Sequence, residues 1–221
     1  MKRTILTASG LLVLGVAQSQ PAGTWLIQGG LTHIDPQVRS GTLSAPSPAG
    51  TRVDVGADTQ PTAQVTYLYD TNWALALPLG MGFTHKVYGA GAIAGTGQIG
   101  TVKVLPIGPF VQYRWGEAEA QVRPYAMLGL NYAYFRSSHG SATLNGLNPI
   151  NPPGGSTGMK TDSRWALTPG LGVVLQLEGG WFMDLNWSKS FLRTTSTLST
   201  GQSLDLRLDP AITMLGLGRR F

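Results

Sequence analysis

The sequence predicts an all-β protein, namely an eight-stranded antiparallel up-and-down transmembrane β-barrel. Three observations predict this fold class. Apolar residues alternate with small or polar residues over several segments, as they do on strands with one apolar face. The stretches 73–84, 104–113, 124–135, 165–177 and 210–218 contain no Asp, Glu, Lys or Arg. Lipid-facing strands exclude such residues, since one Lys or Arg near the bilayer midplane costs about 2–4 kcal/mol. Connections between the segments alternate between long and short.

The N-terminus has the features of a secretory signal peptide. Two basic residues precede an apolar run from Ile5 to Val16, and Ala17 and Ser19 follow at the positions where signal peptidase reads small residues. The run is too short to span a bilayer comfortably, which disfavours an N-terminal membrane anchor. We therefore expect residues 1–19 to be removed, and residues 20–221 to form a single outer-membrane β-barrel domain.

The strands are predicted from alternation of period two. From Trp73 onward, for example, the odd positions are bulky and apolar as far as Phe83, while the even positions are mostly small. About ten residues at a rise of about 3.3 Å, tilted near 45°, cover an apolar band of about 25 Å. Eight segments fit this length: 24–34, 61–69, 73–85, 101–115, 122–136, 164–177, 181–192 and 204–221.

The connections between these segments predict the orientation of the barrel. The long ones are 35–60, 86–100, 137–163 and 193–203, and the short ones are 70–72, 116–121 and 178–180. Outer-membrane barrels have short periplasmic turns and longer outer loops. We therefore predict a protein of the cell outer membrane, in contact with its lipid, with both termini in the periplasm.

Aromatic residues fall at the two ends of the predicted strands. They predict two girdles in the two headgroup layers of the membrane. One girdle contains Trp25, Trp73, Trp115, Trp181 and Phe221, and the other contains Phe83, Tyr134, Trp165 and Phe191.

Four prolines lie inside predicted strands, at Pro78, Pro106, Pro109 and Pro169. A closed barrel has no free edge at which a missing N–H is harmless. We therefore expect bulges or local breaks at these positions, with nearby glycines absorbing the geometry.

Several longer segments carry a resemblance to a known family. They are HKV (85–87), GTVKVLPIGPFVQYRW (100–115), RPYAMLGLNYAYF (123–135), DSRW (162–165) and LDPAITMLGLGRRF (208–221). In this order the chain resembles the OmpW family of outer-membrane proteins. The resemblance implies an eight-stranded barrel with a narrow, rather apolar interior and a role in the passage of small hydrophobic compounds. Leu215, Leu217 and Phe221 resemble the C-terminal signal that the barrel-assembly machinery reads, which implies that machinery and periplasmic chaperones as partners.

The inward-facing positions predict what the interior contains. Alternation places mostly small residues inside, with Gln112, Met127, Asn131, Gln176, Asp184 and Asn186 as candidate lumen-lining residues. Apart from Asp184, we expect almost no charge in the middle of the barrel. Such an interior favours a narrow channel for small hydrophobic molecules. A structural barrel, or a receptor or adhesion barrel acting through its outer loops, remains the alternative, and a conductance measurement separates the two.

Catalytic and cofactor chemistry have little support in the sequence. Cysteine is absent, and His33, His85 and His139 are scattered without the spacing of metal ligands. Ser138 precedes His139 without an obvious acid partner, so no triad is indicated. The glycine-rich stretch 89–100 lacks the Lys-Ser/Thr of a phosphate-binding loop. No basic cluster suggests nucleic-acid binding. We therefore predict no enzyme activity, no cofactor and no metal.

Overall fold

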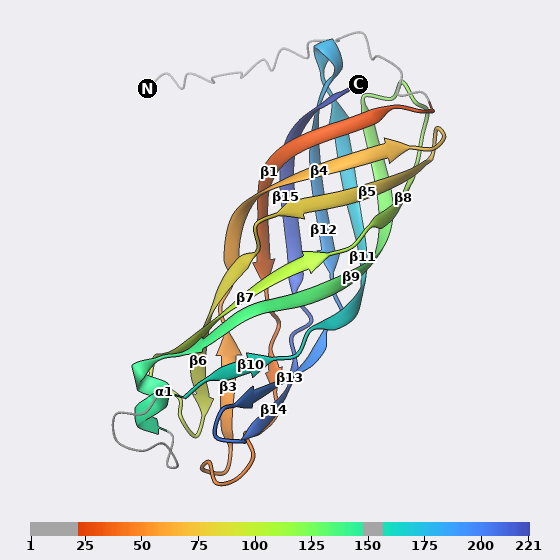
Figure 1. Ribbon diagram of the computed structural model, residues 1–221. Coiled ribbons are helices and arrows are strands. Elements are labelled where there is room, and N and C mark those ends of the chain that lie inside the picture. The colour runs from red at the N-terminus through yellow and green to blue at the C-terminus, as the bar shows by residue number, and fades with distance from the viewer. Residues whose placement is uncertain (1–21, 148–156) are drawn as a thin grey trace, which may run out of the picture.

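The computed structural model describes residues 22–147 and 157–221, and within them eight strands form a closed antiparallel barrel (Figure 1). In ring order the strands are β1 (Trp25–Asp35), β4 (Asp58–Leu68), β5 (Trp73–Gly80), β8 (Phe110–Arg114), β9 (Val122–Gly140), β11 (Arg164–Gln176), β12 (Trp181–Lys189) and β15 (Ala211–Arg220). The ring closes because β9 pairs with both β8 and β11. The predicted fold class is confirmed. The predicted signal peptide lies outside the described residues.

Both ends of the barrel domain lie at one end of the barrel, called here the terminal end (Figure 1). The Trp25 N–H donates to the Phe221 carbonyl at 3.0 Å, which ties the first strand to the last residue. The short connections all lie at this end, including the 3-10 turn η1 (Glu178–Gly180) between β11 and β12. The opposite end is called the distal end. None of the helices in the described part of the chain is long and apolar enough to cross a membrane.

The outside of the ring is an apolar belt. Along β12 exposed and buried residues alternate without interruption, and the exposed ones are bulky and apolar. Such a surface is unfavourable in water and favourable in lipid. The belt includes Ile27, Leu31, Leu75, Leu77, Val111, Leu128, Leu130, Leu167, Leu171, Leu185, Leu215 and Leu217. The predicted girdle residues are exposed at its two margins, with one exception.

The exception is Phe83, which the alternation from Trp73 places outside and which is only 3% exposed. The predicted strand 73–85 is not continuous. It breaks at Met81 and Gly82, where the glycine adopts a φ of +94°, and the chain resumes as β6 (Phe83–Gly91). Because the break shifts the alternation by one residue, Phe83 turns inward and Thr84 outward.

Two other predicted strands are also divided. Segment 101–115 forms β7 (Gln98–Ile107) and β8, separated by Gly108 and Pro109. A Cβ atom on Gly108 would lie 2.2 Å from the Leu130 carbonyl oxygen, so only glycine fits this close approach. Segment 204–221 forms β14 (Ser203–Arg207) and β15, separated at Asp209, which has a φ of +33°.

The predicted long loops are largely folded, which corrects the sequence-based expectation. β6, β7 and β3 (Thr51–Val55) extend the barrel wall beyond the ring (Figure 1). A second sheet pairs β10 (Met159–Thr161), β13 (Arg193–Leu198), β14 and β2 (Arg39–Ser40). A short helix, α1 (Ala142–Leu147), lies beside this distal wall. Five of these elements, β2, β3, β10, β13 and α1, lie in predicted connections, and they were missed because they are short and mostly polar.

The prolines occupy places where one side of the strand is already unpaired. Pro78 lies beyond the β5–β8 pairs, which end at Ala76, and Pro106 lies beyond the β6–β7 pairs, which end at Val104. Pro109 stands in the break between β7 and β8, as expected. The expectation was wrong for Pro169, which lies within a continuous β11. There the ladder to β12 starts only at the next residue, so a missing N–H is tolerated.

Candidate functional site

The terminal half of the barrel interior is filled by side chains. A buried cluster, called here the terminal cluster, packs across the lumen between strands on all sides. It consists of Leu26, Leu68, Ala74, Ala76, Phe110, Tyr125, Met127, Val174 and Phe182. Eight strands enclose an interior that side chains can fill, and here they do so.

Polar groups complete this filling. The Tyr125 hydroxyl donates to Asp184 Oδ1 at 2.8 Å, and Gln28 Nε2 donates to Asp184 Oδ2 at 3.1 Å. Gln176 Nε2 donates to the carbonyl oxygens of Ala118 and Ala120, at 3.0 and 2.9 Å, in the turn between β8 and β9. These bonds cross from strand to strand and close the lumen toward the terminal end.

Two arginines also lie inside the barrel. Arg114 is 1% exposed and Arg123 is 0% exposed. Arg114 donates to Gln112 Oε1 at 2.9 Å and lies over the Tyr125 ring, while Arg123 donates to the Thr71 carbonyl at 2.6 Å. The expectation of an interior almost free of charge was therefore wrong. Alternation along the strands could have predicted this. Arg114 lies two residues after Gln112 and Arg123 lies four residues before Met127, and both Gln112 and Met127 were placed inside.

The distal half is open. A cavity of about 130 Å³, called here the distal cavity, lies inside the extended wall formed by β3, β6, β7 and the second sheet. Its lining is mostly aliphatic and aromatic, with Val55, Val87, Val102, Phe135, Leu192 and Leu206 among the contributing residues. Val55 and Val87 come from segments where the sequence indicated loops, and the other four come from segments predicted as strands.

A second cavity of about 80 Å³ adjoins the distal cavity. The two share Ile34, Pro106, Asn131 and Ile212 in their linings, so the second cavity lies between the distal cavity and the terminal cluster. Of the predicted lumen-lining residues, Met127, Asn131 and Asn186 line it. The other three, Gln112, Gln176 and Asp184, are buried in the filled terminal half. All six point inward, but they divide between two environments.

The second cavity reaches the barrel wall at an unpaired stretch between β5 and β7, called here the wall gap. Its lining includes Leu79 and Gly80 of β5 and Leu105 of β7. In β5, residues 77–80 pair with no strand on the side away from β4, and in β7, residues 105–107 pair only with β9. The wall therefore lacks backbone hydrogen bonds between β5 and β7. The exposed Leu77 and Leu79 place this gap at the level of the apolar belt.

His85 lies on the inner face of β6 and is 2% exposed. Its Nδ1 lies 2.8 Å from the Gly56 carbonyl oxygen. This part of β6 lies beyond the apolar belt, because the outward neighbours Thr84 and Lys86 are polar and exposed. Burial lowers the pKa of His85 below its usual value of 6.5; the Gly56 carbonyl and Asp58 oppose this effect and His33 adds to it. The ring is therefore neutral near pH 7.

The remaining candidate residues lie apart from these cavities. Leu215, Leu217 and Phe221 are exposed on the outer surface of β15 and at its end, and their role as an assembly signal stays a prediction. His33 faces outward and contacts Thr59 Oγ1 at 2.8 Å. His139 lies at the distal end of β9, bridged to Gly158. In the described residues no three His, Asp or Glu side chains gather as a metal site would require.

Comparisons with known proteins agree with this architecture. The model of the OmpW family matches residues 21–221. Outer membrane protein W of Vibrio cholerae is 30% identical over 233 residues, covering 100% of both chains. The dibenzothiophene metabolism operon protein PahQ of Pseudomonas aeruginosa is 25% identical over 225 residues, covering 100% of both. The crystal structure of the outer membrane protein OprG from Pseudomonas aeruginosa matches with a TM-score of 0.81 at 24% identity, over 92% of this chain and 98% of OprG.

Proposed function

Because the chain belongs to the OmpW family of outer-membrane β-barrels, we propose that it passes small hydrophobic molecules from its distal cavity through the wall gap into the membrane. The observation that carries this proposal is that the second cavity adjoins the distal cavity and is lined by residues of the wall gap. The terminal cluster and its polar partners fill the straight path along the barrel axis. A solute in the distal cavity would therefore leave sideways, through the wall gap.

The chemistry of this route suits apolar solutes. The lining of the distal cavity is mostly aliphatic and aromatic, and the gap opens beside Leu79 and Leu105 at the level of the belt. An apolar protein cavity of about 150 Å³ holds benzene, and the distal cavity of about 130 Å³ is similar in size. Transfer from this cavity to lipid exchanges one apolar environment for another, so no large free-energy barrier from desolvation is expected.

The orientation follows from the same proposal. We place the termini in the periplasm and the distal cavity toward the cell exterior, since short turns lie at the terminal end and longer segments at the distal end. A hydrophobic molecule would then enter from outside and bypass the polar surface layer of the membrane. PahQ is named for dibenzothiophene metabolism, and dibenzothiophene is an apolar arene of the kind that this route would accept.

Assembly of the barrel is proposed to use the C-terminal signal. Leu215, Leu217 and Phe221 form an exposed apolar face on the last strand and at its end. In the finished ring this strand lies between β1 and β12. Before the ring closes, periplasmic chaperones and the barrel-assembly machinery would bind this face.

The experiment compares initial uptake of radiolabelled naphthalene in a strain that lacks the protein and in strains that carry variants. The wild-type gene should restore uptake. Gly80→Trp places a large ring in the wall gap, because a Cβ at Gly80 has only Thr62 Cγ2 nearby, at 3.4 Å. Uptake with this variant should fall to that of the deletion strain.

The matched control is Gly29→Trp, which adds the same side chain on the lipid side of β1, where nothing lies within 4 Å of a Cβ. It should keep wild-type uptake. Equal uptake with and without the protein would contradict the proposal and favour a receptor or adhesion barrel that acts through its distal segments.

A further inference from the structure

The polar side chains that line the distal cavity are almost all engaged. Asn131 Nδ2 donates to Thr168 Oγ1 at 2.9 Å, Gln202 Nε2 to Ser47 Oγ at 2.8 Å, and Thr51 Oγ1 to the Pro48 carbonyl at 2.7 Å. The hydroxyls of Thr161, Ser190 and Ser196 also have partners within hydrogen-bond distance. These groups already have hydrogen-bond partners in the wall, so they leave little hydrogen-bonding capacity for a solute.

His85 is the exception among the lining residues. A carbonyl oxygen can only accept, so the contact with Gly56 requires that His85 Nδ1 carries the proton. In the neutral ring Nε2 is then an acceptor with a free lone pair. Nε2 is buried and has no hydrogen-bond partner among the described residues. An unpaired buried acceptor is costly, and an occupant that supplies a donor removes this cost.

The position of His85 places this acceptor on the proposed route. His85 lies opposite Val102 across the β6–β7 pair, and both line the distal cavity. Its ring stacks against Phe83, with centroids 6.4 Å apart, and Phe83 lines the second cavity. The imidazole therefore lies where the two cavities meet.

We propose that His85 Nε2 accepts a hydrogen bond from the solute. The cavity therefore binds a largely apolar molecule with one hydroxyl or N–H donor more tightly than a similar molecule without the donor. Hydroxylated arenes, medium-chain alcohols and N–H heteroarenes fit this class, and pure hydrocarbons lack the donor. This assignment rests on the proposed function and narrows its substrate class.

The test measures binding of 2-naphthol, 2-methoxynaphthalene and naphthalene by equilibrium dialysis against the full chain in amphipol, with protein-free amphipol as blank. The wild type should bind 2-naphthol roughly five- to tenfold more tightly than the methoxy compound, the increment of one neutral hydrogen bond. His85→Phe should bring this ratio to about one and leave affinity for the methoxy compound unchanged. His33→Phe, on the outer surface, should keep the wild-type ratio.

A measurement on the wild type covers the case that His85→Phe does not fold. The ¹⁵N resonance of His85 Nε2 should move when 2-naphthol is added and stay in place with naphthalene. Equal affinities for the three compounds would overturn the His85 assignment and leave the proposed function standing. If none of the three binds, both are overturned.

A different observation concerns the outer surface of the distal end. Arg193 of β13 lies directly opposite Arg207 of β14, and Arg207 lies directly opposite Arg39 of β2. Their neighbours Thr194 and Leu206 point into the barrel. Alternation therefore places all three side chains outside. They form an arginine row across three adjacent strands.

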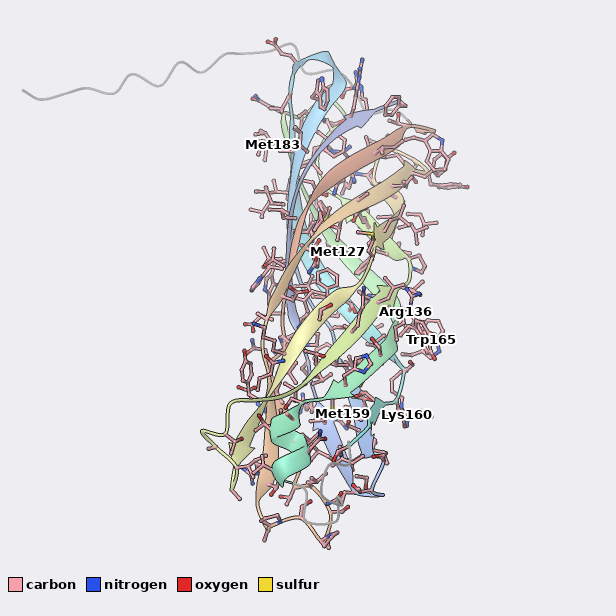
Figure 2. The ribbon with its side chains drawn as sticks, turned by 60° about the vertical axis from the view of Figure 1, so that its left-hand side comes forward. Met127, Arg136, Met159, Lys160, Trp165 and Met183 are labelled. Carbon is pink, nitrogen blue, oxygen red and sulfur yellow. The ribbon has the colours of Figure 1, made fainter. Side chains whose placement is uncertain are left out.

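The charges of this row are incompletely balanced. Directly opposed like charges destabilise a sheet. Arg207 pairs with Asp209 and nearby Arg164 pairs with Asp162, whereas no ion pair in residues 22–147 and 157–221 involves Arg39 or Arg193. A hollow on the outer face joins Arg164, Arg193 and Arg207 to the belt-edge rings of Trp165 and Phe191. Figure 2 shows Trp165 on the outside of the wall.

The geometry points to a binding site for the phosphate groups of a phosphorylated glycolipid of the outer leaflet, the lipid A class. Guanidinium groups bind phosphate through paired charge-assisted hydrogen bonds. The site lies at the margin of the belt, where headgroups meet aromatic rings. The acyl chains of the same lipid would cover the belt below it.

The test is native mass spectrometry of the purified full chain with bisphosphorylated lipid A, the same lipid dephosphorylated, and phosphatidylglycerol. Retention of bisphosphorylated lipid A should fall by about tenfold or more in Arg39→Gln/Arg193→Gln. It should be unchanged in Arg52→Gln/Lys86→Gln, which removes two exposed cations elsewhere on the distal wall. Equal retention by the first variant, or equal binding of the dephosphorylated lipid or of phosphatidylglycerol, would overturn the assignment.

Discussion

Tyr125 and Asp184 meet inside the barrel, where the tyrosine hydroxyl donates to Asp184 Oδ1 at 2.8 Å. Tyr125 lies on β9 and Asp184 on β12, two strands that β11 separates in the ring. The bond therefore spans the inner face of β11, where Gly172 leaves room for the Tyr125 ring. Together with the Gln28–Asp184 bond it makes the terminal half of the barrel a packed polar and aromatic interior.

Removal of this bond should destabilise the barrel. Tyr125→Phe keeps the ring and leaves Asp184 Oδ1 without its donor, which should lower the free energy of unfolding by about 1–3 kcal/mol. Urea titration of the protein in lipid vesicles measures the change. Tyr113→Phe, on the outward face of β8, is the control and should have little effect. Equal stability of the two variants would show that the lumen bond contributes nothing.

The ring strands could be predicted because lipid imposes a simple rule on their outer face. In β12, Trp181, Met183, Leu185 and Trp187 alternate with buried residues, and the structure places these four apolar side chains outside. The rule failed where the chain breaks. Nothing in the alternation from Trp73 shows that Gly82 adopts a positive φ, so Phe83 was assigned to the wrong face.

The site was predictable only in part. Asn131, Asn186 and Asp184 are all buried, but alternation along a strand does not show that Asn131 and Asn186 lie beside a cavity while Asp184 lies in packed surroundings. Part of the lining of the distal cavity comes from segments such as β13, whose sequence Arg-Thr-Thr-Ser-Thr-Leu resembles a polar loop. Their pairing depends on long-range contacts, which local patterns do not encode.

The stability of the barrel should depend on pH through His85. Burial is the main cause of its lowered pKa, so the unfolded chain binds this proton more readily than the folded one. The neutral ring contributes its full share of the free energy of unfolding above pH 6.5. This share is lost as the pH falls from 6.5 through the lower pKa that His85 has in the folded state. Urea titrations between about pH 8 and about pH 5 should show this loss in the wild type. It should be absent in His85→Phe and retained in His33→Phe; identical pH slopes in all three would contradict it.

The break between β7 and β8 should tolerate only glycine. In Gly108→Ala the added methyl group would lie 2.2 Å from the Leu130 carbonyl oxygen, and the backbone cannot easily move away. We expect a loss of about 1–3 kcal/mol of stability, as in overpacked interiors. Gly29→Ala is the matched control, because no atom lies within 4 Å of its added Cβ. A Gly108→Ala barrel as stable as this control would show that the strand break is not held by close backbone approach.

The axial and lateral routes should respond differently when the terminal half is emptied. Arg114→Ala/Tyr125→Ala removes two large buried side chains from the lumen and leaves the wall gap in place. Water and ions should then cross, so single-channel conductance in planar bilayers should rise above the low wild-type level. Naphthalene uptake by cells should not rise, since the proposed exit for an apolar solute is the gap between β5 and β7. Arg52→Ala on the exposed distal wall is the control for conductance and should match the wild type. If uptake rose in parallel with conductance, the solute would be using the barrel axis, and the lateral route would have to be abandoned.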